Sequence, residues 1–229
     1  MQLKDISFNT PQENLAFDDV LLHLADKQQA GEFLRFWESP SIFIVLGRIG
    51  KEQEDVNLEL AQAEGVPVLH RSSGGGTVVQ GPGCLNYSFI LSKQNHPVLN
   101  DLRRSYEWIS EKVTETLGSL GVKAYFRPIS DLATDPGEKK FSGNAQKRGK
   151  NHILHHGTIL YSFDLNLINR YLKMPKDIPE YRKGRPHADF VTNIPINPQA
   201  FKAALAKRFS LSFPAQPLTA QELSSLKNI

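Results

Sequence analysis

Two stretches of the chain repeat apolar residues every three or four positions, the spacing that places side chains on one face of a helix. The longer stretch runs from Leu99 to Leu120, and Gly121 follows it where a helix C-terminus favours glycine. The other begins with Thr10-Pro11-Gln12-Glu13, in which threonine and glutamate form a capping box and proline takes the first helical position. Both patterns predict helices with one buried face.

Shorter patterns of the same period predict further helices, two of which carry clear capping signals. Asn197 and Thr219 precede the last two helices, and Glu222 completes a second capping box. The predicted helices cover residues 58–64, 165–173, 198–209 and 220–227.

Apolar and β-branched runs between the helices predict strands. Residues 32–37 and 41–46 predict a hairpin, because Glu38-Ser39-Pro40 between them favours a turn. Single strands are expected at 66–69 and 122–126, an irregular loop at 131–137, and a second hairpin from 140–146 and 152–163. Strands that arrive mostly as hairpins, with helices between them, predict an α+β fold with mixed, largely antiparallel β-sheets packed with helices.

The composition is that of an ordinary globular protein. With 229 residues, of which 40% are hydrophobic and 22% charged, a single domain with a substantial core is expected. The one cysteine, Cys84, excludes an intramolecular disulfide and a Cys-rich zinc site, and it suits a reducing cytosol.

Neither targeting nor strong charge is evident. No basic start is followed by an apolar run, and no stretch approaches the roughly 18 apolar residues that span a bilayer. The net charge is +3, and basic residues cluster only at 139–150 and 182–185. We therefore expect a cytoplasmic protein without a membrane or nucleic-acid partner.

Three consecutive glycines, Gly74 to Gly76, stand inside the segment from Arg71 to Asn86. Ordering a glycine costs roughly 0.5 to 1 kcal/mol relative to alanine, so a triple glycine usually meets a backbone requirement. Backbone N–H groups of such a segment can hold phosphate or carboxylate oxygens, and Arg71 supplies a positive charge beside them. A flexible surface loop is the alternative. The segment matches neither the phosphate-binding P-loop nor a dinucleotide fingerprint.

Lys140 lies in a second candidate segment, residues 138–146, next to a basic loop. On a regular strand Lys140, Ser142 and Asn144 would share one face. A lysine that faces a pocket can hold a carboxylate and a phosphate together, whereas a solvated charge on an exposed hairpin is the alternative. The spacing does not choose between them.

Three histidines in the predicted strand, His152, His155 and His156, raise the possibility of a metal site. Adjacent strand residues point to opposite faces, so His155 and His156 do not readily share one ion, and no carboxylate lies nearby in the sequence. The pattern favours a structural or substrate-facing histidine over a zinc site.

The order of these segments is more informative than any one of them. R-S-S-G-G-G-T-V, then G-P-G-x-L-N-Y-S, K-F-S-G-N-A-Q and H-H-G-T-I-L follow one another. This series resembles the biotin/lipoate protein ligase superfamily, specifically the lipoate–protein ligase A catalytic domain, from about Asn14 to about Asn193. The resemblance implies the α+β fold of that domain.

The resemblance also implies an activity. Enzymes of this family activate lipoate with ATP to lipoyl-AMP and pass the lipoyl group to a lysine of a lipoyl domain. Lys140 would be catalytic, contacting the lipoyl carbonyl and the α-phosphate, where an ammonium stabilises developing negative charge. The substrate-binding residues implied are Arg71, Ser73, Gly74, Gly75, Gly76, Thr77, Val78, Val79, Asn86, Lys140, Gly143 and His156.

A metal role is implied for Asp131. It stands in Ser130-Asp131-Leu132, where ligases place an Asn-Asp pair, and would help to hold Mg²⁺ around the ATP phosphates. Serine in place of asparagine weakens this assignment.

The related octanoyl transferases, which form a cysteine thioester and need no ATP, are the main alternative. In their ligase-like branch the nucleophile lies upstream of the lysine motif, where residues 128–139 contain no cysteine. Cys84 is predicted to be a small buried residue and not a nucleophile. A lipoate- or nucleotide-binding protein without activity is a third possibility.

Several positions depart from the family pattern. His70 stands where many ligases have a second arginine, and Gln80-Gly81 replaces a frequent His-Asp pair, which would alter the acyl pocket. The match implies one catalytic domain over 1–229 without the accessory C-terminal domain of many ligases. The implied partners are a lipoyl-domain acceptor, such as a 2-oxoacid dehydrogenase E2 or a glycine cleavage H protein, and a separate accessory chain.

Overall fold

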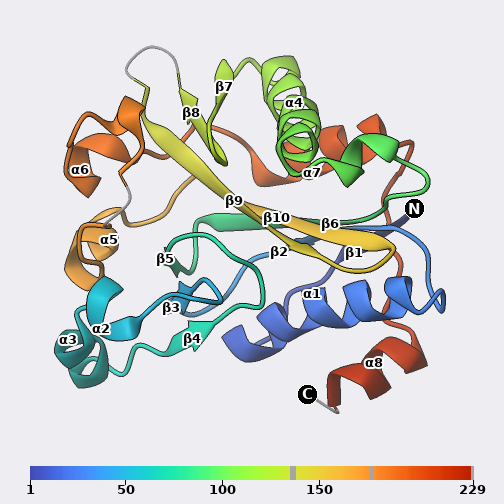
Figure 1. The fold of residues 1–229 in the computed structure, drawn as a ribbon, viewed down its shortest axis with the longest axis horizontal. Helices are drawn as coiled ribbons and strands as arrows, with labels where there is room; N and C mark the ends of the chain where they lie inside the picture. The colour runs from blue at the N-terminus through green and yellow to red at the C-terminus, as the bar shows by residue number, and fades with distance from the viewer. Residues whose placement is uncertain (135–137, 176–177, 228–229) are drawn as a thin grey trace.

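A seven-stranded sheet crosses the middle of the molecule and is covered by helices on both faces (Figure 1). The computed structural model describes residues 1–134, 138–175 and 178–227. The sheet has the order β1-β2-β6-β10-β9-β8-β7, and only β1 and β2 run parallel within it. Its strands are β1 (Gln2–Asp5), β2 (Phe33–Trp37), β6 (Cys84–Ser92), β7 (Ala124–Arg127), β8 (Asp131–Thr134), β9 (Lys140–Arg148) and β10 (His152–Leu160).

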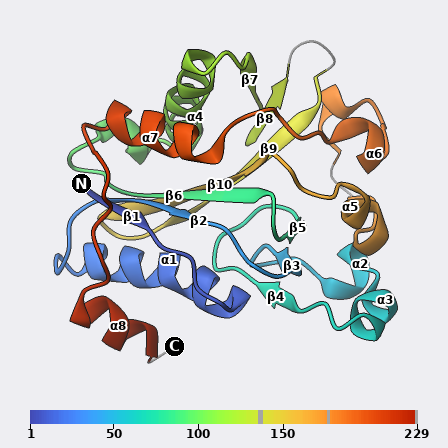
Figure 2. The same ribbon diagram turned by 180° about the vertical axis from the view of Figure 1, so that it is seen from behind.

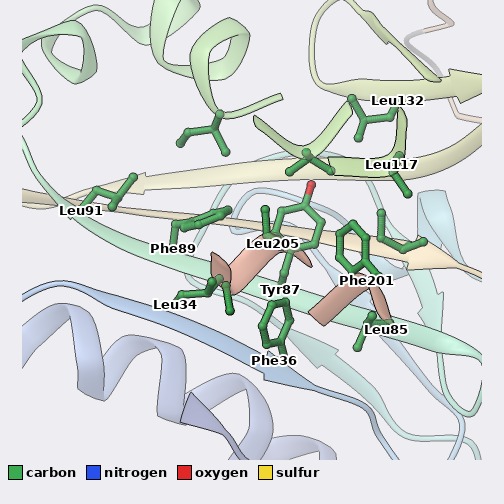
Figure 3. Close-up of a cluster of buried hydrophobic side chains, with 14 of the residues drawn as sticks. Leu34, Phe36, Leu85, Tyr87, Phe89, Leu91, Leu117, Leu132, Phe201 and Leu205 are labelled. Atoms are coloured by element: carbon green, nitrogen blue, oxygen red, sulfur yellow. The ribbon is translucent and has the colours of Figure 1, made fainter. Parts of the chain in front are cut away.

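Helices α4 (Leu102–Ser119) and α7 (Pro198–Arg208) cover one face of this sheet, and α1 (Pro11–Asp26) covers the other, with α8 (Ala220–Lys227) packed on α1 (Figure 2). The predicted caps are present. Thr10 accepts a hydrogen bond from the Glu13 N–H at 3.3 Å, and Glu222 bonds back to the Thr219 N–H at 2.7 Å. The largest buried apolar cluster lies between the sheet and α4 and α7, with Tyr87 near its centre (Figure 3).

A second, three-stranded sheet lies on the α1 side and carries the glycine-rich segment. It consists of β4 (Val68–His70), β3 (Phe43–Leu46) and β5 (Val78–Gln80), in that order. The glycine-rich segment connects β4 to β5, the two edge strands. The remaining short elements are α2 (Glu52–Asp55), α3 (Leu58–Ala63), α5 (Asn166–Tyr171), α6 (His187–Phe190) and the 3-10 turns η1 (Pro97–Asn100) and η2 (Glu180–Arg182).

The α+β prediction is confirmed, but two local predictions are wrong. Strands β2 and β3 do not form a hairpin, because β1 and β6 occupy both edges of β2 and leave no edge for β3. Residues 131–134 are not an irregular loop: they form β8, which pairs with β7 and β9, while 135–137 lie outside the described residues. The predicted β9–β10 hairpin and the long helix over α4 are confirmed.

Within residues 1–134, 138–175 and 178–227, no helix is both long enough and apolar enough to cross a membrane.

Candidate functional site

The glycine-rich segment between β4 and β5, residues 71–77, forms a tightly held loop that we call the glycine loop. Gly75 has a φ of +88°, a left-handed conformation that favours glycine. A side chain at Gly47 would bring its Cβ within 2.1 Å of the Gly75 carbonyl oxygen, so two glycines are required where β3 meets this loop. The glycine loop is therefore packed on its neighbours, which argues against a loose surface connection.

Arg71 holds the glycine loop from the inside. Its guanidinium donates to the carbonyl oxygens of Gly74 at 2.7 Å and Gly76 at 2.8 Å, and to that of Val45 at 3.3 Å. Burial lowers the pKa of this guanidinium to about 10, which still leaves it protonated at neutral pH. Two of its hydrogen bonds thus go to glycine-loop carbonyls and a third to β3, so the guanidinium is engaged within the protein, whereas the sequence suggested that it faces a ligand.

Ser73 connects Arg71 to His156 on β10. The Arg71 Nε–H donates to Ser73 Oγ at 3.1 Å, and Ser73 Oγ lies 2.7 Å from His156 Nε2. Burial, and then the charge of Arg71, lowers the pKa of His156 to about 3, so the imidazole is neutral at physiological pH. A neutral ring can accept the Ser73 hydroxyl proton at Nε2, while Ser73 Oγ accepts from the Arg71 Nε–H.

Two carboxylates secure the ends of the glycine loop. Asp19 of α1 accepts from the Ser72 hydroxyl at 2.6 Å and pairs with Lys147 of β9 at 2.8 Å. At the other end Asp55 accepts from the Thr77 hydroxyl at 2.6 Å. The loop is thus tied to α1, β9 and α2.

Lys140 faces the same side of β9 as the glycine loop. The pairing register of β8 and β9 shifts so that Leu132 lies opposite Ser142 but Ala133 lies opposite Lys140. This β-bulge turns both Phe141 and Ser142 toward the α4 core and sends Lys140 to the other side. The prediction that Lys140, Ser142 and Asn144 share a face is therefore wrong.

Gly143 and Ala145 connect the two halves of the site. A Cβ at Gly143 would lie 3.2 Å from Lys140 Cε and Nζ, so the lysine side chain passes over this glycine. A Cβ at Gly75 would lie 3.6 Å from the Ala145 Cβ, two residues further along β9. Lys140 over Gly143 and the glycine loop over Ala145 are therefore neighbours on one face of β9.

Asp131 pairs with the Lys140 ammonium, and Tyr181 binds Asp131. Asp131 Oδ1 lies 2.8 Å from Lys140 Nζ, and the Tyr181 hydroxyl donates to Asp131 Oδ2 at 2.7 Å. Burial, followed by the Asp131 charge, raises the pKa of Tyr181, so the phenol keeps its proton and acts as a donor. Tyr181 was not among the sequence-predicted site residues, since nothing in its local sequence marks it.

The surroundings of Asp131 do not fit a resident metal ion. Each carboxylate oxygen already has a partner, and one of these partners is a cation. Among residues 1–134, 138–175 and 178–227, no group of three or more His, Cys, Asp or Glu side chains is placed to hold a metal.

Asn86 belongs to a closed polar triad that joins the two sheets. Gln80 Nε2 donates to Thr158 Oγ1 at 2.7 Å, Thr158 Oγ1 donates to Asn86 Oδ1 at 2.6 Å, and Asn86 Nδ2 donates to Gln80 Oε1 at 3.2 Å. The remaining Asn86 donor bonds to the Cys84 carbonyl at 3.3 Å. The Asn86 side chain is thus engaged within the protein.

An apolar cluster beside the glycine loop was missed by the sequence analysis. Trp37, Phe43 and Val45 are buried, and Leu15, Leu69 and Val78 pack against them while keeping part of their surface accessible. Within the part of the chain that the structure describes, the buried indole Nε1 of Trp37 has no hydrogen-bond partner. These residues come from five separate elements, α1, β2, β3, β4 and β5, so no local pattern could have grouped them.

Two further predictions are confirmed. Cys84 is completely buried, and this burial raises the pKa of its thiol. His155 and His156 face opposite sides of the sheet, since His155 Nδ1 lies 3.0 Å from Gln146 Nε2 and its ring packs against Tyr106 of α4.

Comparison with known proteins gives consistent matches. The family model of the lipoyl protein ligase A/B catalytic domain matches residues 10–210. The chain is 33% identical over 168 residues to a probable lipoate-protein ligase A of Mycoplasma pneumoniae, covering 73% of this chain and 48% of that protein. It is 26% identical to octanoyltransferase LipM of Brevibacillus brevis, covering 94% and 89% of the two chains. The chain thus spans about half the length of the ligase and most of the transferase.

The fold is also similar to solved structures. The bi-partite lipoate protein ligase of Thermoplasma acidophilum superposes with a TM-score of 0.83 at 22% identity, covering 99% of this chain and 90% of that one. At this identity the similarity concerns the fold alone.

Proposed function

Because the chain belongs to the lipoyl protein ligase A/B catalytic domain family, we propose that it activates lipoate with ATP and transfers the lipoyl group to a protein lysine. In the first half-reaction a lipoate carboxylate oxygen attacks the α-phosphorus of ATP and pyrophosphate leaves. In the second, the ε-amine of the acceptor lysine attacks the acyl carbonyl of lipoyl-AMP. AMP leaves, and the amine proton passes to solvent.

The observation that carries this proposal is the placement of Lys140 and the glycine loop on one face of β9. Negative charge develops on carbonyl and phosphate oxygens in both half-reactions. A preorganised ammonium stabilises such charge without reorganisation during the reaction. No protein nucleophile is required. The carboxylates at both ends of the glycine loop, Asp19 and Asp55, would keep it in place while the adenylate forms.

We assign the lipoyl chain to the apolar cluster of Trp37, Phe43 and Val45. Leu15, Leu69 and Val78 line it with accessible apolar surface, and Val78 directly follows the glycine loop. An acyl chain on this surface would place its carboxylate toward the loop. Gly74 to Val79 and His156 would then border the acyl-adenylate, as the family resemblance implies.

The environment of Cys84 fits an ATP-free transferase, which forms a cysteine thioester, less well than it fits a ligase. Cys84 is fully buried with a raised thiol pKa, whereas a thioester mechanism needs an accessible thiolate. The similarity to LipM keeps this reading as the second candidate, and it predicts transfer from octanoyl carrier protein without ATP.

We expect the acceptor to be a lipoyl domain, because the acyl group must reach an exposed lysine of a partner protein. The Thermoplasma relative is described as a bi-partite ligase with an E2 lipoyl domain. A separate accessory polypeptide is therefore worth including in any test of adenylation.

The proposal is tested by incubating the protein with lipoate, Mg-ATP and an apo lipoyl domain, with and without an accessory ligase polypeptide. The acceptor should gain the mass of a lipoyl group, and pyrophosphate should be released. Lys140→Ala should lower the rate by roughly 10²- to 10³-fold, as removal of one charge-stabilising group typically does. Lys207→Ala, which removes an exposed lysine of α7, is the matched control and should leave the rate unchanged.

Two outcomes would contradict the proposal. Transfer from octanoyl carrier protein without ATP, lost in Cys84→Ser, would establish the transferase. Binding of lipoate or ATP without turnover in either assay would indicate a binding protein.

A further inference from the structure

Tyr181, Asp131 and Lys140 form a chain of polar contacts that ends at the Lys140 ammonium. The Tyr181 hydroxyl donates to Asp131 Oδ2 at 2.7 Å, and Asp131 Oδ1 lies 2.8 Å from Lys140 Nζ. The Asp131 side chain is 11% exposed and that of Lys140 28%, so solvent screens this pair only in part. The Asp131 carboxylate thus accepts a hydrogen bond at one oxygen and pairs with the Lys140 ammonium at the other.

The strands that carry this chain place the ammonium in one position. Asp131 lies directly opposite Gly143 in the β8–β9 pairing, and the β-bulge brings Lys140 around to the same spot. The absence of a side chain at Gly143 lets Lys140 cross it, since a Cβ there would lie 3.2 Å from Nζ and 3.8 Å from Asp131 Oδ1. The ammonium is therefore positioned by Asp131 over Gly143.

Tyr181 is itself fixed with respect to β9. Its ring packs against Phe190 with the centroids 5.2 Å apart. Immediately beyond Phe190, Val191 forms a parallel β-bridge with the backbone of Lys140. The Thr192 N–H donates to the Lys140 carbonyl at 2.9 Å. The segment that carries Tyr181 is thus anchored at the backbone of the lysine whose side chain it helps to orient.

This arrangement is inconsistent with a metal-binding role for Asp131. A divalent cation at its carboxylate would lie beside the Lys140 ammonium, and the like charges would repel each other. Instead, we propose that Asp131 and Tyr181 are positioning residues that orient the Lys140 ammonium for the reacting carboxylate and phosphate. The catalytic half of this statement rests on the proposed ligase function, while the orientation of Lys140 can be measured without any activity.

The orientation is tested by labelling the full-length protein with N-hydroxysuccinimide acetate and following acetylation of Lys140 by mass spectrometry. Tyr181→Phe removes only the hydroxyl and keeps the ring on Phe190, so the fold should survive. Lys140 should be acetylated at least roughly threefold faster in Tyr181→Phe, because Asp131 loses the hydroxyl that fixes it. Acetylation should be faster still in Asp131→Asn, because the ammonium then loses its counter-ion. Tyr161→Phe is the matched control, since it removes a tyrosine hydroxyl bound to Glu38 at 3.0 Å.

The kinetic test measures lipoyl-AMP formation at varied lipoate and varied Mg²⁺, with ATP held constant. Tyr181→Phe should lower kcat by roughly three- to tenfold with little change in the KM for lipoate, because a poorly oriented ammonium stabilises the transition state less. Asp131→Asn should lower kcat further. The Mg²⁺ concentration for half-maximal activity should not change in either variant.

Each result separates this proposal from its alternatives. Unchanged acetylation of Lys140 in both variants would overturn the proposed orientation whether or not the protein is a ligase. A higher Mg²⁺ requirement in Asp131→Asn, with unchanged acetylation, would assign Asp131 to the metal. If acetylation rises as expected but no variant or wild-type protein adenylates lipoate, the orientation stands and the proposed function fails.

Discussion

His155 and His156 are neighbours in the chain but serve opposite sides of the large sheet. His156 lies against Ser73 of the glycine loop, and His155 lies against Gln146 under α4. Burial lowers the pKa of both imidazoles to about 3, aided by His156 for His155 and by Arg71 for His156. Both are therefore neutral in the folded protein near neutral pH, while in the unfolded chain they titrate near pH 6.5.

We expect this difference to make stability depend on pH. Between about pH 6.5 and pH 3 the unfolded chain binds more protons than the native state, so the free energy of unfolding falls as the pH is lowered. The stabilisation is fully present above pH 6.5, and each histidine contributes a slope of about 1.4 kcal/mol per pH unit below it. Urea unfolding between pH 6.5 and pH 5 measures this slope before most carboxylates titrate.

Substitutions can test whether His155 and His156 cause this dependence of the free energy of unfolding on pH. His156→Asn should remove about half of the contribution of the pair, whatever its effect on absolute stability. His23→Gln, at an exposed histidine of α1, serves as control. A slope that His156→Asn leaves unchanged would show that this ring is not buried in a neutral form.

At the scale of elements, the site depends on how the small sheet is attached to the large one. The glycine loop lies between β4 and β5 of the small sheet, but Lys140 lies on β9 of the large sheet. The triad of Gln80, Thr158 and Asn86 bonds β5 to β10 and β6 at the point where the sheets meet. Each member of the triad bonds to both of the others, and the second Asn86 donor bonds to the Cys84 carbonyl, so the triad can set this geometry where Gln80 and Asn86 are buried.

Thr158→Val should loosen this attachment. Valine has nearly the same shape but leaves the Gln80 donor and the Asn86 acceptor without partners, which costs about 1 to 3 kcal/mol when such groups are buried. Urea unfolding should show this loss. Amide hydrogen exchange in residues 72–79 should also accelerate.

Thr114→Val on α4 provides the comparison, since its partly exposed hydroxyl donates to the Glu111 carbonyl of the same helix at 3.1 Å. If both valine variants lower stability equally, the triad has no special role in joining the sheets.

At the scale of the whole molecule, the C-terminal segment connects the helices on one face of the large sheet to those on the other. After α7 the chain passes along the β1 edge and continues to α8, which packs beside α1 (Figure 2). On the way the Gln216 N–H donates to the Leu3 carbonyl at 2.8 Å. Lys4 of β1, with no exposed surface, pairs with Glu222 of α8 at 2.9 Å and donates to the Pro217 carbonyl at 2.8 Å.

Removing the acid from this buried pair should be costly. Glu222→Ala leaves the Lys4 ammonium buried without a counter-ion, and such changes lower stability by about 3 to 5 kcal/mol. Thermal or urea unfolding measures the effect. Glu115→Ala, which breaks the partly exposed pair with Arg208, should cost about 1 kcal/mol or less.

An effect of Glu222→Ala as small as that of Glu115→Ala would indicate that the C-terminal segment separates readily from β1. In that case α8 contributes little to the stability of the domain.

The sequence by itself determined those features that depend on local chemistry and on the order of motifs. Helix caps such as Thr10 and Thr219 act within one turn, and the apolar spacing of α4 reflects a helical period that needs no knowledge of the partner. The motifs around Arg71, Lys140 and His156 indicated the family, because their order and spacing are specific.

The tertiary structure decided the features that depend on residues distant in the chain. The edges of β2 were taken by β1 and β6, which no property of residues 38–40 could reveal. Lys140 changed its face through a bulge that exists only in the pairing of β8 with β9. Arg71 turned to its own loop carbonyls, and Asp131 met Lys140 and Tyr181 from other segments, because side-chain partners are chosen by proximity in space and not along the sequence.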